Sequence, residues 1–134
     1  MIVVDTNVLT YLVVAGEKTA VAQQAYQKDN NWVAPALWQH ELLNVLSTHV
    51  KLGVLHLPDA LLAWQNCQQI LADRAFDVDM ETALQLSTKE EISAYDAQFL
   101  LLAQTFGCQL LTEDRQLVKK FPGLAFTLNE FLLT

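Results

Sequence analysis

Four acidic residues stand where hydrophobic stretches of the chain give way to polar ones. Asp5 and Asp114 each close a short apolar run, Asp96 lies at the head of a strongly apolar segment, and Glu41 lies within another. Carboxylates gathered into one pocket repel each other, and a hard divalent cation relieves that repulsion. These residue types therefore suggest metal-dependent phosphodiester chemistry as the first hypothesis.

The elements that would position these acids alternate along the chain. Strands are expected at 2–4, 32–34, 75–78, 109–111 and, at an edge, 125–127. Helices are expected at 8–14, 18–28, 35–52, 58–72, 80–88, 93–107 and 113–119, with a last helical turn at 129–133. Strands separated by helices indicate right-handed crossovers, and so an α/β fold with a parallel sheet and helices on both faces. No linker or repeat interrupts the pattern, so residues 1–134 are predicted to form one domain.

In such a sheet, ligands bind outside the carboxyl ends of the strands. Asp5 directly follows the first expected strand and Asp114 follows the fourth, so both are expected at that edge. Each region also has a plainer interpretation, because Asp5 and Thr112 are good helix N-caps. Spacing alone does not decide whether Glu113 or Asp114 faces the pocket.

Asp96 and Glu41 complete the candidate set from helices. Asp96 follows Ser93 in an S-x-x-acid capping pattern, which is compatible with a second role beyond the helix N-terminus. Glu41 lies inside the expected helix 35–52, with Pro35 in its first turn, so no cap explains it. Glu41 and Asn44 share a narrow polar stripe and are expected to point toward one polar site, although a solvated face would also explain the stripe.

The composition of the chain limits which classes of protein it can belong to. The chain has 134 residues, 52% of them hydrophobic, enough for a real core, and no run long enough to cross a bilayer. A net charge of −7 argues against binding nucleic acid through a basic surface alone, so a metal ion or a basic partner must bridge to any phosphate. Met1 leads straight into a strand without a signal-peptide pattern, and the two cysteines form no metal motif, so a cytoplasmic protein is expected.

Together, four segments resemble a PIN domain, and within that superfamily the VapC-like toxins of bacterial toxin–antitoxin pairs. They are Ile2-Val-Val-Asp5-Thr6-Asn7-Val8, Glu41-x-x-Asn44, Tyr95-Asp96-Ala97 and Leu111-Thr112-Glu113-Asp114. Each motif is weak alone, but the ordered set is specific and extends over essentially the whole chain. The resemblance implies a doubly wound sheet of four to five strands and an endoribonuclease that depends on Mg²⁺ or Mn²⁺.

The resemblance also implies roles for individual residues. Asp5, Glu41, Asp96 and Asp114 match the family's catalytic, metal-binding acids. The side chains that would orient substrate, water or carboxylates are Thr6, Asn7, Asn44 and Thr112. Hydrolysis of RNA would leave a 5′-phosphate and a 3′-hydroxyl.

The implied partners are an RNA substrate, a cognate antitoxin and a second copy in a homodimer, with no membrane. An antitoxin helix could use a groove along helices 8–14 and 18–28, although core packing explains most of their apolar residues. Two alternatives stay open: a catalytically silent interaction domain of the same fold, and an RNA-processing nuclease that is not a toxin. A phosphatase is disfavoured because position 7 is Asn, and a DNA nuclease because the chain lacks extra helices to clamp DNA.

Overall fold

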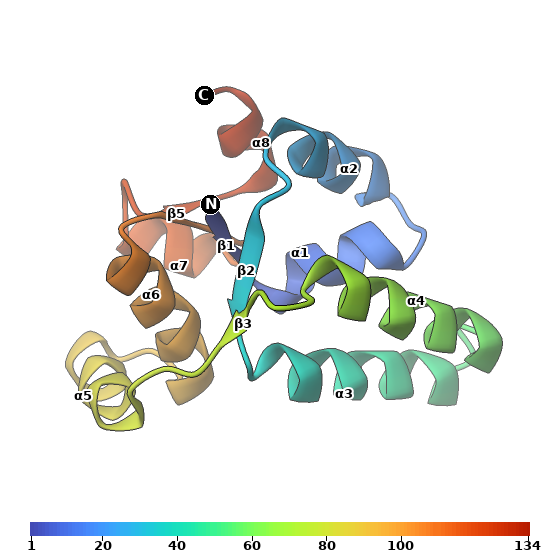
Figure 1. Ribbon diagram of the computed structural model, residues 1–134, viewed down its shortest axis with the longest axis horizontal. Coiled ribbons are helices and arrows are strands. Elements are labelled where there is room, and N and C mark those ends of the chain that lie inside the picture. Colours follow the sequence, from blue (N-terminus) through green and yellow to red (C-terminus); the bar gives the residue numbers. More distant parts are fainter.

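Five short strands form one parallel sheet in the computed structural model, which describes all 134 residues (Figure 1). The strands are β1 (Ile2–Val4), β2 (Trp32–Pro35), β3 (Ala75–Phe76), β4 (Gln109–Leu111) and β5 (Ala125–Phe126). Their order across the sheet is β3-β2-β1-β4-β5, and every neighbouring pair is parallel. The predicted doubly wound α/β sheet is confirmed, with two-residue strands at both edges.

Eight helices connect and cover these strands. They are α1 (Thr6–Val13), α2 (Thr19–Lys28), α3 (Trp38–Lys51), α4 (Leu57–Ile70), α5 (Met80–Glu90), α6 (Ala94–Phe106), α7 (Arg115–Lys120) and α8 (Leu128–Leu132). In Figure 1, α5, α6 and α7 lie on one side of the strands and α1, α3 and α4 on the other, while α2 packs against α8. No helix combines the length and the apolar character that crossing a membrane requires.

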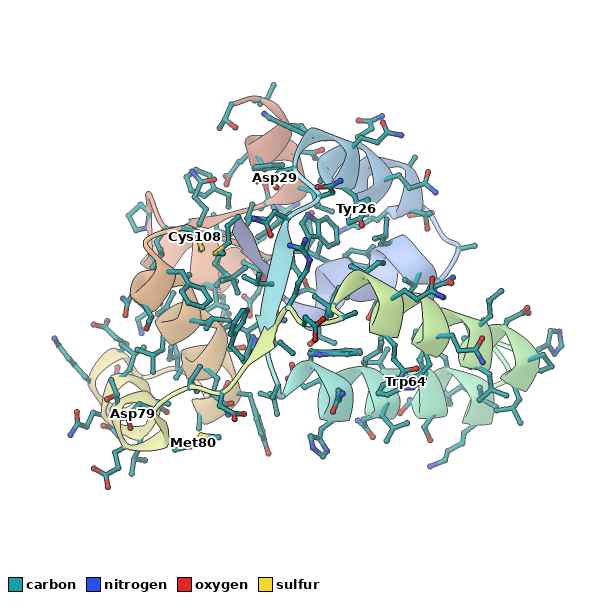
Figure 2. All side chains as sticks on the ribbon, in the orientation of Figure 1. Tyr26, Asp29, Trp64, Asp79, Met80 and Cys108 are labelled. Carbon is teal, nitrogen blue, oxygen red and sulfur yellow. The ribbon has the colours of Figure 1, made fainter.

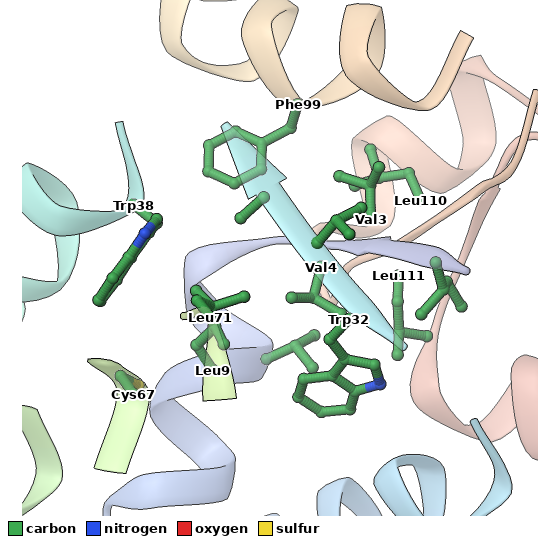
Figure 3. Close-up of a cluster of buried hydrophobic side chains, with 14 of the residues drawn as sticks. Val3, Val4, Leu9, Trp32, Trp38, Cys67, Leu71, Phe99, Leu110 and Leu111 are labelled. Carbon is green, nitrogen blue, oxygen red and sulfur yellow. The ribbon is translucent and has the colours of Figure 1, made fainter. Parts of the chain in front are cut away.

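The central strands are continuous apolar runs because both faces of the sheet are covered. Val3, Val4, Leu110 and Leu111 are completely buried; Val3 and Leu110 lie on the face of the sheet toward Phe99 of α6, and Val4 and Leu111 lie on the opposite face (Figure 3). They belong to one cluster of 26 buried residues that extends from the sheet into the helices on both sides. Burial of this kind is the main favourable contribution to folding, so it fixes the strand ends on which the candidate acids stand.

Local signals set the limits of α6, the helix that carries Asp96. The Ser93 hydroxyl accepts a hydrogen bond from the Asp96 N–H at 2.9 Å, as the capping pattern predicted. Gly107 ends the helix with φ 62°, a left-handed conformation that glycine adopts without steric cost. The first turn of α6 therefore has a defined position relative to the sheet.

Helix α3 begins later than predicted, because Pro35 is the last residue of β2 and not part of a helical turn. Ala34 and Ala36 donate their N–H groups to Arg74 and Phe76 on the β3 side. The nitrogen of Pro35 consequently faces the other side, where β1 has already ended, so its missing N–H costs no ladder hydrogen bond. The interpretation of Pro35 as a helix-starting residue was wrong.

Two tryptophans pack together between α3 and α4. Trp38 is 2% exposed, and the ring of Trp64 stacks on it with centroids 5.3 Å apart. Trp64 projects from α4 toward α3 (Figure 2), so the pair joins these two helices. This packing fixes the start of α3, where Glu41 lies.

Candidate functional site

The four acids lie at the carboxyl edge of the sheet, where the strand order reverses. β1 and β4 are neighbours, with Val4 opposite Leu111, and the Asp5 N–H continues the ladder to the Leu111 carbonyl at 2.9 Å. The crossovers from β1 to β2 and from β4 to β5 run outward in opposite directions from this point. A crevice outside the strand ends at such a switch point is the usual ligand site of an open α/β sheet.

Each acid also stands at the beginning of a helix. Asp5 caps α1, Asp114 caps α7, and Asp96 is the third residue of α6. Glu41 lies in the first turn of α3, nearer the helix start than predicted, because α3 begins at Trp38 and not at Pro35. Helix N-termini carry partial positive charge, which stabilises carboxylates and offsets part of their mutual repulsion.

Asp5 is the most deeply buried member of the set, at 8% exposed. Its Oδ1 accepts the Thr6 N–H at 2.8 Å and its Oδ2 accepts the Thr112 hydroxyl at 2.7 Å. Burial raises the pKa of Asp5 to about 6, and the charges of Asp96 and Glu41 push it in the same direction, while the two hydrogen bonds oppose them. The side chain is thus held in one orientation by the protein although ionising it there is costly.

Thr6 joins Glu41 to this arrangement. Its hydroxyl donates to Glu41 Oε1 at 2.7 Å across a separation of 35 residues. Burial raises the pKa of Glu41, and the nearby charge of Asp96 adds to the rise. Asn44, one turn further along α3, is exposed and forms no hydrogen bond, so only Glu41 of the predicted pair is joined to the other acids.

Asp96 links the four acids electrostatically. Burial raises its own pKa, and so does the charge of Asp114, while the charge of Asp96 raises the pKa values of Asp5 and Glu41. Asp96 and Asp114 face each other across a cleft of about 200 Å³. The structure therefore brings Asp5, Glu41 and Asp114 within electrostatic range of Asp96, at the edge of the sheet where the sequence predicted them.

Thr112 connects Asp5 to Asp114. Its hydroxyl donates to Asp5 and accepts the Asp114 N–H at 3.1 Å. Thr112 is not the cap of α7, contrary to expectation, because Asp114 Oδ1 accepts the N–H groups of Gln116 and Leu117 at 2.9 and 3.3 Å. The hydroxyl is committed to Asp5 instead.

We expect Thr112→Val to lower the free energy of unfolding by about 1–3 kcal/mol. Thr112 is completely buried, so the similarly shaped valine would leave an Asp5 oxygen and the Asp114 N–H without a partner. Urea unfolding measures the change, with Thr105→Val as control because the Thr105 hydroxyl bonds an exposed carbonyl within its own helix. If the two variants lose the same free energy of unfolding, the hydrogen bonds of the Thr112 hydroxyl do not stabilise the fold more than an exposed one does.

The structure also separates the two neighbouring acids after β4. The carboxylate of Glu113 accepts the Leu128 N–H at 3.1 Å and pairs with Lys18 at 3.7 Å, on the side away from the cleft between Asp96 and Asp114. Asn7 fixes this turn, since its Oδ1 accepts the Glu113 N–H at 3.3 Å. Asp114, not Glu113, therefore faces Asp96.

These acids suit a hard cation that keeps part of its water shell. No three His, Cys, Asp or Glu side chains are already arranged as a set of metal ligands. Mg²⁺, however, commonly binds one or two carboxylates directly and completes its coordination with water and substrate phosphate. Oε2 of Glu41 and Oδ2 of Asp114 have no hydrogen-bond donor in the protein, and the Asp96 carboxylate has only the Ser93 hydroxyl beside it. The free oxygens and the mutual repulsion of the acids therefore fit Mg²⁺ or Mn²⁺.

One basic residue of the acidic cleft, Lys120, was not among the predicted site residues, because three basic residues are too few to define a phosphate-binding track from sequence. Lys120 lines the cleft with Asp96 and Asp114 and donates to the Glu90 carbonyl at the end of α5. Its only sequence signal is that it lies on the short helix capped by Asp114, with two other basic residues. His40, next to Glu41 in the sequence, is exposed.

Comparisons with known proteins agree with this fold. Ribonuclease VapC3 of Pyrobaculum aerophilum is 29% identical over 126 residues, which cover 92% of this chain and 96% of that protein. The crystal structure of PAE2754 from Pyrobaculum aerophilum matches with a TM-score of 0.72 at 22% identity, covering 98% of this chain and 93% of the other. The family model of the PIN domain matches residues 2–122. The chain therefore belongs to the PIN domain family.

Proposed function

We propose that this chain is an endoribonuclease that depends on Mg²⁺ or Mn²⁺, and that it acts in the cytoplasm as the toxin of a toxin–antitoxin pair. The observation that carries the proposal is the electrostatic coupling of four acids from four helix starts at the switch point of the sheet. The name of the relative Ribonuclease VapC3, which matches nearly end to end, supports RNA as the substrate. The fold alone would leave the substrate open.

In this proposal Asp5, Asp96 and Asp114 hold the cation and Glu41 contacts it directly or through water. A bound Mg²⁺ or Mn²⁺ supplies Lewis acidity, which activates water and stabilises negative charge on the phosphoryl oxygens. Thr6 and Thr112 keep the Glu41 and Asp5 carboxylates in fixed orientations through their 2.7 Å hydrogen bonds. Preorganised groups of this kind need no rearrangement as the reaction proceeds.

Glu41 is positioned to act as a general base, which accepts a proton. Its Oε1 accepts the Thr6 hydroxyl, while Oε2 has no hydrogen-bond donor and can accept a proton from the attacking water. The raised pKa of Glu41 makes it a stronger base than an exposed glutamate. In-line attack would release a 5′-phosphate and a 3′-hydroxyl.

The proposal includes an antitoxin partner and a homodimer. An Arg or Lys from an inhibitor could form charge-assisted pairs with the acids and block the metal site. Residues of α1 and α2 expected to line its groove, such as Leu12 and Tyr26, mostly pack against the core and leave only a shallow cleft toward α4. A more apolar groove of about 440 Å³ lies between α3 and α4, so we place an antitoxin helix there in preference.

A cleavage assay on a panel of messenger, transfer and ribosomal RNAs tests the proposal. We expect cleavage with Mg²⁺ or Mn²⁺, its loss on adding a chelator, and its recovery when excess metal is restored. The product ends, mapped by sensitivity to a 5′-phosphate-dependent exonuclease, should carry 5′-phosphates. Cleavage that persists in chelator, or no cleavage of any RNA in the panel, would contradict the proposed activity.

A further inference from the structure

A second cleft lies next to the acidic site, on the other side of α7. It encloses about 680 Å³ between α7, β5 and the first turn of α8. Glu113 forms part of its wall, and its N–H is bonded to Asn7 beside the candidate site, so the two clefts adjoin. In Figure 1, α7 and β5 lie together at the side of the sheet that ends in β4 and β5.

Helix α7 divides its basic side chains between the two clefts. Arg115 and Lys119 are four residues apart, so they share a face, and both line the second cleft. Gln116 and Lys120 have the same spacing on another face and line the acidic cleft. Three of the eight basic residues of a chain with net charge −7 are therefore concentrated within six positions directly after Asp114.

The cations of the second cleft are free, whereas its acids are engaged. Glu113 accepts the Leu128 N–H and pairs with Lys18. Glu130 accepts the Thr127 N–H in the capping box of α8. Arg115 and Lys119 are exposed and form neither a hydrogen bond nor an ion pair. The two cations are available to a ligand and outnumber the one carboxylate that no cation pairs with, Glu130, so the cleft favours a ligand with negative charge.

The remaining wall suits a nucleotide strand more than a simple anion. The half-buried ring of Phe126 offers an apolar surface to a base, and the side chain of Asn129 is exposed with no partner in the protein. Side chains at i and i+4 of a helix have Cβ atoms about 5–6 Å apart, so Arg115 and Lys119 can each reach a separate phosphate. Cationic clefts with aromatic surfaces are the usual means of holding single strands.

We propose that this second cleft binds the backbone of single-stranded RNA beside the bond to be cut, with Arg115 and Lys119 contacting phosphates. The inference rests on the proposed ribonuclease function, since it assigns a binding site to that substrate. Phosphate contacts of this kind position a strand without reading its sequence. They would hold RNA on an acidic protein whose acids, without metal, repel it.

Fluorescence anisotropy with a fluorescein-labelled 12-nucleotide RNA of mixed sequence tests the cleft directly. In an Asp96→Asn background that suppresses cleavage, we expect Arg115→Gln with Lys119→Gln to raise Kd about tenfold and to lower the slope of log K against log salt by about 1.4. The control is Lys51→Gln with Lys89→Gln, two exposed lysines on other helices, which removes the same charge. We expect this control to change Kd less than twofold.

Exchanging the two charges, Arg115→Lys with Lys119→Arg, should restore binding, which excludes a folding defect as the cause. In the otherwise native chain with Mg²⁺, the glutamine pair should raise KM for RNA cleavage with kcat nearly unchanged, as expected for lost uniform binding. If the native chain cleaves RNA but the glutamine and control pairs bind it equally, the cleft proposal is overturned. If the native chain cleaves no RNA, the proposed function fails instead, so the two failures can be told apart.

Discussion

Asp96→Asn is expected to lower kcat/KM for RNA cleavage by about 10³-fold while the fold remains intact. Asp96 is coupled to all three other acids, and no cationic side chain pairs with its carboxylate, so the cation and its water can bind there. Lewis-acid stabilisation by a metal is worth several kcal/mol, and roughly 4 kcal/mol corresponds to this loss. The amide also removes a negative charge that holds the cation against dissociation.

Asp59→Asn is the matched control for this variant. Asp59 and Asp96 are each the third residue of a helix, α4 and α6, so both substitutions remove the same favourable interaction with a helix N-terminus. That loss is about 0.3–1 kcal/mol of stability in either case. Steady-state cleavage rates and thermal unfolding of both variants separate the two effects. Similar activity in Asp96→Asn and Asp59→Asn would remove Asp96 from the catalytic set.

The second large effect is on stability: the metal-free protein should become less stable as pH rises from about 4 to about 6. The folded chain keeps a proton on Asp5 up to a pKa of about 6, because that carboxyl is buried, whereas the unfolded chain loses it near 3.8. Between these values the folded state binds more protons, so raising the pH favours unfolding, by about 3 kcal/mol in total. The raised pKa values of Glu41 and Asp96 act in the same direction.

Asp5→Asn should remove most of this dependence and make the metal-free protein more stable than the native chain at pH 7.5. Asparagine can still accept the Thr6 N–H and donate to the Thr112 hydroxyl, without a buried charge. Mg²⁺ should stabilise the native chain but not the variant, since a ligand that binds only the folded state shifts unfolding in its favour.

Urea unfolding in chelator from pH 4 to 8 measures both effects, with Asp79→Asn as the control. Asp79 is also an N-cap aspartate, but it is exposed, and asparagine caps helices about as well as aspartate. The control should follow the native pH profile. A native profile that rises between pH 4 and 6, or an Asp5→Asn profile with the same shape as the native one, would show that Asp5 is not held protonated by burial.

Much of the fold could be predicted from local patterns. Apolar runs such as Ile2–Val4, and Leu110 with Leu111 in β4, are typical of strands buried on both faces. Ser93 and Gly107 mark the ends of α6 through their own conformational preferences. Pro35 was assigned wrongly because its fixed φ suits both a helix start and the end of a strand. Only the neighbouring strands β1 and β3, which are distant in sequence, decide between the two.

The position of the candidate site could be predicted from the sequence, but the hydrogen bonds between its side chains could not. Strand ends and helix starts meet at one edge of a parallel sheet, which is why Asp5 and Asp114 could be placed together from the sequence. The bonds from Thr112 to Asp5 and from Thr6 to Glu41 span 107 and 35 residues, and no local pattern encodes them. The same reason explains the mistaken cap, because the Thr112 hydroxyl has a distant partner that competes with the helix end.

The brevity of the two edge strands limits how another protein can recognise this sheet. Peptides that bind by β-augmentation need a row of unpaired backbone groups, and β3 and β5 each offer only two residues. An added strand would find too little backbone for a stable ladder at either edge. A protein partner must therefore bind side chains on the surfaces of the helices. The specificity of that binding then depends on the surface sequence and not on the fold that all PIN domains share.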